Sequence, residues 1–437
     1  MLDGHRGSDS LVRALREEGG ELAGESSARG FRGFVERAAR LAGVTRVAEI
    51  SFLSPGGVRV FQATRPDPCS HVFFGQNSSS QGKGRTRARA RLSALLEAIE
   101  GYSAEPRNVD LVRGSYTFLQ RVRPIISPDR YRHQRARNAW DDAPLVWTSA
   151  LCLRRHVDVL VPAERVFFPF FPADYETKSF CLSSSTGLGA GVDLLQATLH
   201  GLHEVIERDY RAKVQRGSDQ VVVEQLSPID VARLPLVKRI LRQQPELSVL
   251  VLSLRHQGAS LDSPVMLMSI LLDPEGGTNC GFCSDFSVRR ALDRSLTEAM
   301  QCLVTGLSAT REDATIRRLA DADAPAPRDV AVHPAPALDS APRVGLSELG
   351  ERGQKGLDDP RREVAALVAF VASLGLPDVL VKDLTRLGID VPVVRVVVPG
   401  AEEPDSEQRE NYDFGWADLV TCRFSTDANP EGRSACC

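Results

Sequence analysis

Apolar residues recur at helical spacing in three long segments of the chain. One segment spans Thr86–Ala104 and repeats apolar side chains at Ala88, Leu92, Leu95, Leu96 and Ile99. Comparable patterns run from about Leu194 to Val214 and from Ser287 to Leu307. Because side chains three and four positions apart share one face of a helix, each segment predicts an amphipathic helix.

Short apolar runs between these helices predict strands. Two of them, RVAEISFLS (46–54) and VRVFQATRP (58–66), are separated by Pro and Gly and predict a strand pair in a mixed sheet. A last unit joins a helix, VAALVAFVASLG, to the apolar runs DVLVKDLT and VPVVRVVVPG. Other β-rich stretches are LVWTSALCL, DVLVPAERVFF and SVLVLSL. Together these elements place the chain in the α/β class, as a mixed α+β protein with sheets flanked by helices.

Composition divides the chain into three parts. Residues 1–30 are rich in Gly, Glu, Arg and Ser and predict a weakly ordered arm. Residues 31–405 carry the periodic elements and predict one large body, in which the Pro- and Ala-rich tract 314–345 predicts an exposed loop. Residues 406–437 predict a polar tail.

Charge and hydropathy exclude several classes of protein. The formal net charge of −3 gives no field that would gather nucleic acid or an acidic membrane. The first residues lack the apolar core of a signal peptide, and no stretch approaches the roughly 20 apolar residues of a membrane span. We therefore expect a cytoplasmic protein that binds neither nucleic acid nor membranes.

Nine cysteines are too sparse for a disulfide framework in a chain of 437 residues. Cys280 and Cys283 form a CxxC inside a strand-like run, but no second ligand pair lies nearby, so buried thiols are favoured over structural zinc. Cys436 and Cys437 form no CaaX box, and the sequence assigns them no role.

Paired carboxylates are the first sign of chemistry. Glu97 and Glu100 are three apart on the first predicted helix, and Glu204 and Glu207 repeat the spacing on the second, followed by Arg208. Each pair emerges from one helix face, where like charges repel. A solvated surface explains one such pair best, but both interrupt an apolar stripe. Facing pairs of carboxylates could hold Mg²⁺ against the phosphates of a nucleotide, with Arg208 neutralising a phosphate.

Glycine-rich stretches precede these two helices and predict loops that expose backbone N–H groups to phosphates. Gly82-Lys83-Gly84 fails the Walker A pattern, and the GxGxG beginning at Gly187 fails the dinucleotide pattern, although Lys83 remains a candidate nucleotide contact. The third predicted helix carries a further polar pair three apart, Glu298 and Gln301.

Four segments in order resemble the signature blocks of the YcaO family: SQGKGRTRARARLSALLEAIEGYSAE, STGLGAGVDLLQATLHGLHEVIERDY, SLTEAMQCLVTGLSATRED and VKDLTRLGIDVPVVRVVVPG. The resemblance spans roughly residues 45–405. It implies a YcaO-like fold and an enzyme that uses ATP and Mg²⁺ to phosphorylate a backbone amide oxygen of a ribosomally made precursor peptide, giving a thioamide, an amidine or an azoline.

The resemblance also implies roles for single residues. Glu97, Glu100, Glu204 and Glu207 would be the Mg²⁺–ATP carboxylates and Arg208 a phosphate contact. Nucleotide-binding positions would be Ser185, Gln196, Glu298 and Gln301. The sequence departs from the family pattern at Gln196, usually Glu, at Thr186, usually Asn, and at Gly101 and Leu303, usually Arg.

These departures leave open a catalytically degenerate module that binds a leader peptide or scaffolds a partner enzyme. A different nucleotide-dependent ligase or kinase that shares only the helical carboxylates is a further alternative. The ending NPEGRSACC lacks a PxPxP-like tail, which favours a thioamide- or amidine-forming member or a stand-alone heterocyclase. By resemblance we expect a homodimer and a separate TfuA-like, E1-like or leader-binding partner protein.

Overall fold

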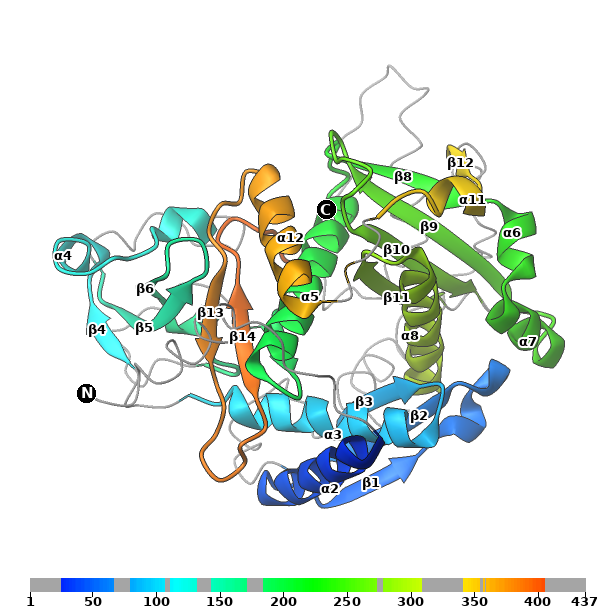
Figure 1. Cartoon of the computed structure of the whole chain (residues 1–437), viewed down its shortest axis with the longest axis horizontal. Helices are drawn as coiled ribbons and strands as arrows, with labels where there is room; N and C mark the ends of the chain where they lie inside the picture. Colours follow the sequence, from blue (N-terminus) through cyan, green and yellow to red (C-terminus); the bar gives the residue numbers. More distant parts are fainter. Residues whose placement is uncertain are drawn as a thin grey trace, which may run out of the picture.

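The computed structural model describes residues 25–66, 79–106, 111–131, 143–170, 184–272, 278–308, 341–353, 357 and 359–404. Most of the predicted arm, most of the Pro- and Ala-rich tract, and the predicted tail with Cys436 and Cys437 lie outside the described residues. Three β-sheets, joined by helices, make up the described chain (Figure 1).

The first sheet has three antiparallel strands in the order β1 (Arg46–Glu49), β2 (Arg59–Thr64) and β3 (Ser79–Gly84). Helix α3 (Arg87–Ser103) packs on β3 and β2, and α2 (Glu25–Leu41) packs on α3. Helix α2 begins six residues before the predicted body. The predicted strand 46–54 is shorter, because residues 51–53 form a 3-10 turn, η1 (Ser51–Leu53), followed by η2 (Pro55–Gly57). The sheet is purely antiparallel, so the prediction of a mixed sheet here was wrong.

The second sheet has the order β11-β10-β9-β8-β12. Only β12, which pairs with β8, is parallel to its neighbour. The strand β12 lies within the tract predicted as loop, so the end of that tract joins the sheet. The elements of this part are β8 (Val221–Leu226), α6 (Pro228–Arg233), α7 (Pro235–Gln243), β9 (Ser248–His256), β10 (Val265–Leu272), β11 (Thr278–Asp285), α8 (Val288–Ser308), β12 (Arg343–Val344) and α11 (Leu346–Leu349).

The third sheet is antiparallel throughout, in the order β4-β5-β13-β14-β7, and β6 pairs with β5 off this path. Helix α5 (Leu194–Gln215) packs on β7 and β14, and α12 (Pro360–Ser373) packs on α5. The remaining elements are β4 (Val112–Gly114), α4 (Tyr116–Leu119), η4 (Pro128–Tyr131), β5 (Leu145–Cys152), β6 (Val157–Pro162), η5 (Ala163–Arg165), β7 (Leu188–Ala190), β13 (Leu380–Asp383) and β14 (Val393–Val397).

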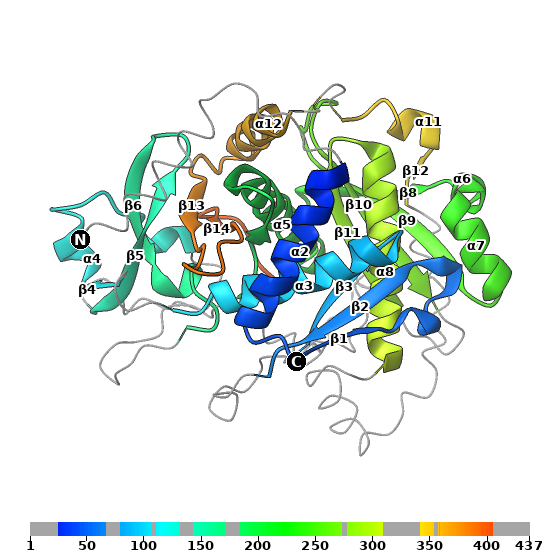
Figure 2. The same ribbon diagram turned by 60° about the horizontal axis from the view of Figure 1, so that its bottom comes forward.

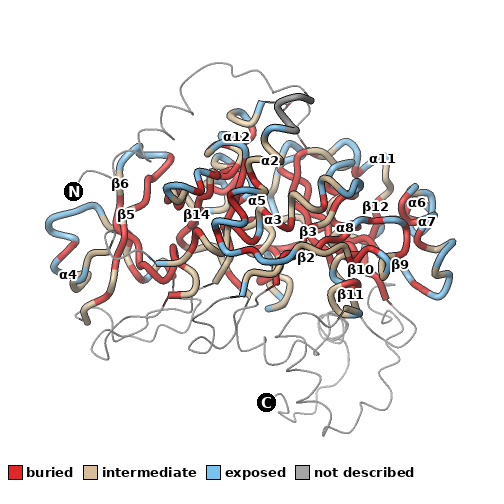
Figure 3. Tube along the Cα trace, turned by 90° about the horizontal axis from the view of Figure 1, so that it is seen from below, coloured by how far each residue is buried: buried red, intermediate tan, exposed pale blue. Residues whose placement is uncertain are grey.

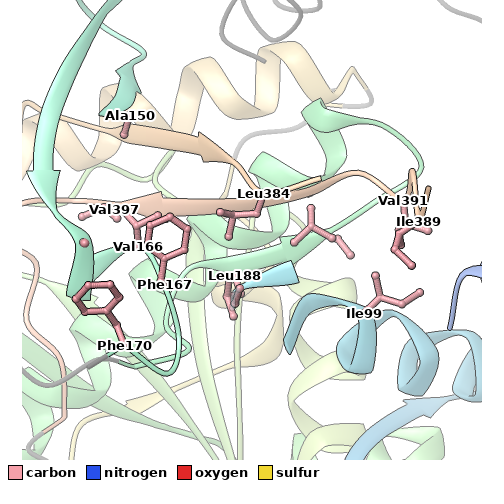
Figure 4. Close-up of a cluster of buried hydrophobic side chains, with 14 of the residues drawn as sticks. Ile99, Ala150, Val166, Phe167, Phe170, Leu188, Leu384, Ile389, Val391 and Val397 are labelled. Atoms are coloured by element: carbon pink, nitrogen blue, oxygen red, sulfur yellow. The ribbon is translucent and has the colours of Figure 1, made fainter. Parts of the chain in front are cut away.

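The buried apolar residues of the described chain form three hydrophobic clusters. Figure 3 shows that buried positions follow the strands and the helices packed on them. Strand β10 shows how the clusters are divided, since every residue of the strand is buried. Met266 and Met268 point into one cluster, whereas Leu267 points into another, as the alternation of side chains along a strand requires. Figure 4 shows part of the cluster that joins α3 to the third sheet, with Ile99 of α3, Phe167 and Leu188 among its members.

Helices α3, α5 and α8 each pack against two of the three sheets. Helix α3 packs on the first sheet and on β7 of the third, α5 packs on the third sheet and on β11 of the second, and α8 packs on the second sheet and on β3 of the first. They surround the centre of the molecule in Figures 1 and 2. All three were predicted within about a residue of their ends. Thr86 and Asp193 cap α3 and α5 by accepting backbone N–H groups.

Candidate active site

Glycines in three strands permit close packing of the three central helices. A Cβ added to Gly82 of β3 would lie 2.0 Å from the backbone N of Ala94 on α3. A Cβ at Gly189 of β7 would lie 2.3 Å from a carbonyl oxygen of α5, and one at Gly281 of β11 would lie 2.1 Å from a carbonyl oxygen of α8. The prediction of a loop at Gly82–Gly84 was wrong. These residues form strand β3, where the missing side chain at Gly82 permits close packing.

The first carboxylate pair lies on α3. Glu97 is exposed, and Glu100, half-buried, turns toward the third sheet. The backbone N–H of Ala190 on β7 donates to Glu100 Oε1 at 2.7 Å. A strand end of one sheet therefore fixes a carboxylate carried by a helix of another.

The second pair, on α5, is held in the same manner. The N–H of Gly187 donates to Glu204 Oε2 at 3.1 Å, and the N–H of Ser284 on β11 donates to Glu207 Oε1 at 2.8 Å. Arg208 Nη2 contacts Glu204 Oε1 at 3.4 Å. Each of the three half-buried glutamates thus accepts one backbone N–H, which leaves further oxygen lone pairs for a cation.

The third helix contributes Glu298 beside Lys83. Lys83 Nζ donates to Glu298 Oε2 at 2.6 Å, so two predicted nucleotide contacts from β3 and α8 form an ion pair. Gln301 Nε2 donates to the carbonyl oxygen of Gln81 at 3.1 Å. Gln301 therefore ties α8 to β3 in this structure.

Burial and mutual repulsion disfavour the ionised carboxylates. Burial first, and then the charges of Glu97 and Glu204, raise the pKa of Glu100 to about 8. Burial also raises the pKa of Glu207, with Glu298 adding repulsion. The pKa of Glu204 is raised by burial and pulled back by Arg208 and then by Arg395. These interactions connect the glutamates of α3, α5 and α8 into one electrostatic cluster.

Two basic residues near the cluster were not predicted from the sequence. Arg294 lies one turn before Glu298 on α8, and its charge acts on Glu207 and Glu298. Arg395 is fully buried in β14, and its charge acts on Glu204. A charged residue inside the apolar run VVRVVV is a signal that could have identified Arg395, because such a residue needs a buried partner.

Two further residues predicted to bind the nucleotide, Ser185 and Gln196, lie in the turn before β7 and in the first turn of α5. Ser185 accepts the N–H of Leu188 with its backbone oxygen, within the turn that leads into β7. Gln196 lies in the first turn of α5, where its own N–H is capped by Asp193 at 2.7 Å. The helical repeat puts Gln196 and Glu207 on one stripe of α5, about three turns apart.

The departures from the family pattern have different structural settings. An added Cβ at Gly101 would lie 3.9 Å from Nη2 of Arg65, so a guanidinium reaches this point from the residue after β2. Leu303 packs in the hydrophobic cluster between α8 and the second sheet, away from solvent. Thr186 is buried in the turn before β7.

A buried hydrogen-bonded group centred on His203 holds in place the strand residue that donates to Glu207. His203 Nδ1 lies 3.1 Å from Ser284 Oγ, and its Nε2 lies 3.3 Å from Glu363 Oε1 on α12. Ser284 therefore touches two turns of α5, through its hydroxyl to His203 and its N–H to Glu207. The contacts fix strand β11 against α5 at the carboxylate.

The donor set fits Mg²⁺ bound together with a nucleotide. Among the residues that the structure describes, no three His, Cys, Asp or Glu side chains lie close enough to hold a metal ion by themselves. Mg²⁺ does not need such a cage, because it commonly takes one or two carboxylates together with phosphate oxygens and water. A bound cation would stabilise the ionised form of these carboxylates, whose pKa values are raised by burial and by mutual repulsion.

The CxxC spacing does not turn its two thiols toward each other. Cys280 and Cys283 belong to β11, where residues three apart face opposite sides of the sheet. Cys283 is buried, and burial raises the pKa values of both thiols. Among the described residues both thiols are free of disulfide bonds, and neither belongs to a group of three potential metal ligands.

Comparison with known proteins places this geometry in a family. A family model described as the ATP- and Mg²⁺-binding YcaO cyclodehydratase matches residues 81–402. An uncharacterised protein of Methanothermobacter thermautotrophicus is 31% identical over 361 residues, which cover 82% of this chain and 90% of that protein. A Rhizobium leguminosarum protein encoded in the tfuA 3′ region is 29% identical, over 84% of this chain and 85% of its own.

Solved structures share the fold. The YcaO protein of Methanopyrus kandleri, bound with AMPPCP and Mg²⁺, matches with a TM-score of 0.62 and 24% identity, over 87% of this chain and 92% of that one. A heterocyclase in complex with substrate and cofactor matches with a TM-score of 0.65 and 19% identity, over 85% of this chain and 52% of its own. The α/β fold predicted from the sequence is confirmed. No helix in the described part of the chain is long and apolar enough to span a membrane.

Proposed function

The chain belongs to the YcaO family, and from that premise we propose that it is an ATP-dependent enzyme that activates a backbone amide of a peptide. The observation that carries the proposal is the set of half-buried glutamates on α3 and α5, each fixed by a backbone N–H and held at a raised pKa. Repulsion between clustered carboxylates is reduced when cations bind among them, so such a site favours cations that arrive together with a polyphosphate.

ATP and Mg²⁺ are the cofactors of this family. When bound, they supply the phosphoryl group that turns an amide oxygen into a leaving group, together with the positive charge that neutralises the phosphates. The nucleophile then adds to the amide carbon, the carbon–oxygen bond breaks, and ADP and phosphate are released.

Residues of the chain have distinct tasks in this scheme. Glu100, Glu204 and Glu207 would supply the Mg²⁺ ligands, with Glu97 and Glu298 at the edges of the cluster. Glu100 holds a proton near neutral pH because its pKa is raised to about 8, and it would release that proton when a cation arrives. Arg208 contacts Glu204 and remains partly exposed, so it can turn toward a phosphate.

We propose that the product is a thioamide, an amidine or an azoline. The three products differ only in the atom that attacks the amide carbon, which is sulfur from sulfide, a nitrogen, or a side-chain heteroatom. The carboxylate cluster serves each in the same way, since it acts on the phosphoryl donor and not on the nucleophile.

We further propose that a precursor peptide and a separate partner protein complete the reaction, and that the chain acts as a homodimer. The microcin synthetase McbBCD of Escherichia coli, which shares the fold at a TM-score of 0.54, is a complex of several proteins and has been solved with pro-MccB17 bound. The Rhizobium relative is encoded next to tfuA, which supports a TfuA-like partner.

The test is turnover by the purified chain with ATP, Mg²⁺ and the peptide, with and without the partner. Phosphate release and the mass of the peptide are followed in wild type, Glu207→Gln and the matched control Glu246→Gln, whose side chain is exposed. We expect release of phosphate coupled to a change of peptide mass in wild type and in the control, and neither in Glu207→Gln.

The change of mass separates a thioamide from the other products, because oxygen-to-sulfur exchange adds mass whereas ring closure with loss of water removes it. Fragmentation of the peptide then distinguishes an azoline from an amidine. Turnover that leaves the peptide unchanged would contradict amide activation. Peptide binding by a wild-type chain that binds no Mg²⁺–ATP would favour the degenerate binding module.

A further inference from the structure

Two consecutive glutamates follow β14 and have opposite surroundings. Glu402 forms an ion pair with Arg216 at the end of α5. Glu403 turns inward, where only 7% of the residue is exposed. A buried carboxylate is costly unless charged or hydrogen-bonded partners surround it.

The partners of Glu403 come from two distant parts of the chain. Its carboxylate forms a buried ion pair with Arg165 of η5, and Ser184 Oγ donates to Glu403 Oε2 at 2.8 Å. Arg395 Nε donates to the carbonyl oxygen of Arg165 at 3.0 Å, which places a second guanidinium beside the pair. Although burial alone would raise it, the pKa of Glu403 is lowered by Arg165 first and then by Arg395 and Ser184.

Ser184 connects this group to the carboxylate cluster. The N–H of Thr186 donates to Ser184 Oγ at 3.4 Å, and one residue later the N–H of Gly187 donates to Glu204 Oε2 at 3.1 Å. Thr186 also lines the same small cavity as Arg165 and Glu403. A continuous series of hydrogen bonds and one short turn therefore runs from Glu403 to Glu204.

We propose that Glu403, Arg165, Arg395 and Ser184 act as a latch that fixes the turn Ser184–Gly187 and thereby the orientation of Glu204. The residues of the latch are positioning residues, since they act through the turn and through the charge of Arg395 on Glu204. The part of the inference that concerns Mg²⁺–ATP rests on the proposed function.

A purely structural role explains the arrangement less well. A buried ion pair is often no more stabilising than apolar residues of the same shape, so its presence points to a requirement for position or charge. The segment after β14 also has anchors that bypass the turn. The N–H of Glu402 donates to Asp209 Oδ1 at 2.8 Å, and Arg216 Nη2 donates to the carbonyl oxygen of Glu403 at 2.9 Å. The Gly187 end of the turn is also held by the N–H of Val396, which donates to the carbonyl oxygen of Gly187 at 2.7 Å. Loss of the Glu403 carboxylate would therefore loosen the Ser184 end of the turn while these anchors hold the rest.

The test compares Glu403→Gln with Glu402→Gln, a neighbour that loses a carboxylate without touching the turn. Amide hydrogen exchange at Gly187 is measured in the nucleotide-free protein, together with thermal unfolding. We expect Glu403→Gln to speed exchange of the Gly187 amide about tenfold, because the substitution removes one charge-assisted hydrogen bond and a bond of that strength corresponds to a change of this size. Exchange in Glu402→Gln should match wild type. Ser184→Ala, which leaves the Arg165–Glu403 pair intact, should speed the same exchange, and it serves if Glu403→Gln does not fold.

Kinetics separate position from stability. With Mg²⁺–ATP, Glu403→Gln should raise KM for ATP about tenfold while kcat changes less, and Glu402→Gln should change neither. Unchanged exchange at Gly187 in a folded Glu403→Gln or Ser184→Ala would overturn the latch. If exchange rises as expected but the wild type binds no Mg²⁺–ATP, the latch stands and the proposed function fails.

Discussion

Replacing Glu100 by Gln should make the nucleotide-free protein more stable. Burial, assisted by Glu97 and Glu204, raises the pKa of this carboxyl from 4.5 to about 8. The folded protein therefore holds the proton more tightly than the unfolded chain, and this contribution to stability, full below about pH 4.5, is lost as the pH rises through about 8. At roughly 1.4 kcal/mol per pKa unit, ionisation at pH 8 costs at most about 4 kcal/mol.

Partial exposure of Glu100 reduces this cost, so we expect a gain of about 2 kcal/mol at pH 8 and almost none near pH 5. The glutamine can still accept the N–H of Ala190, so no hydrogen bond is lost. Urea denaturation in the presence of a chelator measures the difference, with exposed Glu246→Gln as the control. A variant that is less stable than wild type at pH 8, or equally stabilised at both pH values, would refute the reasoning. Stabilised Glu100→Gln should also lose affinity for Mg²⁺–ATP, as functional sites often trade stability for function.

Three further outcomes are expected. The affinity for Mg²⁺–ATP should rise between about pH 6 and pH 8, because protons leave raised-pKa carboxylates on binding; calorimetry in buffers of different ionisation enthalpy would show proton release, and a pH-independent Kd would contradict it. Gly281→Ala in β11 should destabilise the fold by about 2 kcal/mol or more and weaken nucleotide binding, since its Cβ would lie 2.1 Å from a carbonyl oxygen of α8. Gly306→Ala in α8 is the control: its Cβ would meet open space, and it should stabilise the fold by about 0.5–1 kcal/mol. His203→Ala should destabilise by about 2 kcal/mol in urea because it strips buried Glu363 of a partner; an unchanged midpoint would show that water replaces the imidazole.

Local signals predicted the helices and the carboxylate pairs well. The ends of α3 and α5 follow from capping residues adjacent in sequence, and the three-residue spacing of glutamates fixes their common face. Gly82 was misread, because glycine marks loops and close helix–strand contacts alike, and only the tertiary structure distinguishes them.

The support of the carboxylates could not be predicted from the sequence. Glu204 and Glu207 owe their orientation to backbone N–H groups of Gly187 and Ser284, and backbone groups carry no sequence signature. Lys83 and Glu298 are both visible as charged residues, but their pairing depends on α8 reaching the first sheet. Partners so far apart along the chain become recognisable only once the fold brings them together.

The arrangement of α3, α5 and α8, each packed against two sheets, means that no single sheet contains the whole candidate active site. A folding intermediate with only one completed sheet would hold at most part of the carboxylate cluster. Such an intermediate lacks the charge density needed to retain a nucleotide, so nucleotide affinity reports completion of the whole fold. Conversely, nucleotide binding should suppress local opening in all three sheets together, because opening of any one would separate the helices that share the ligand.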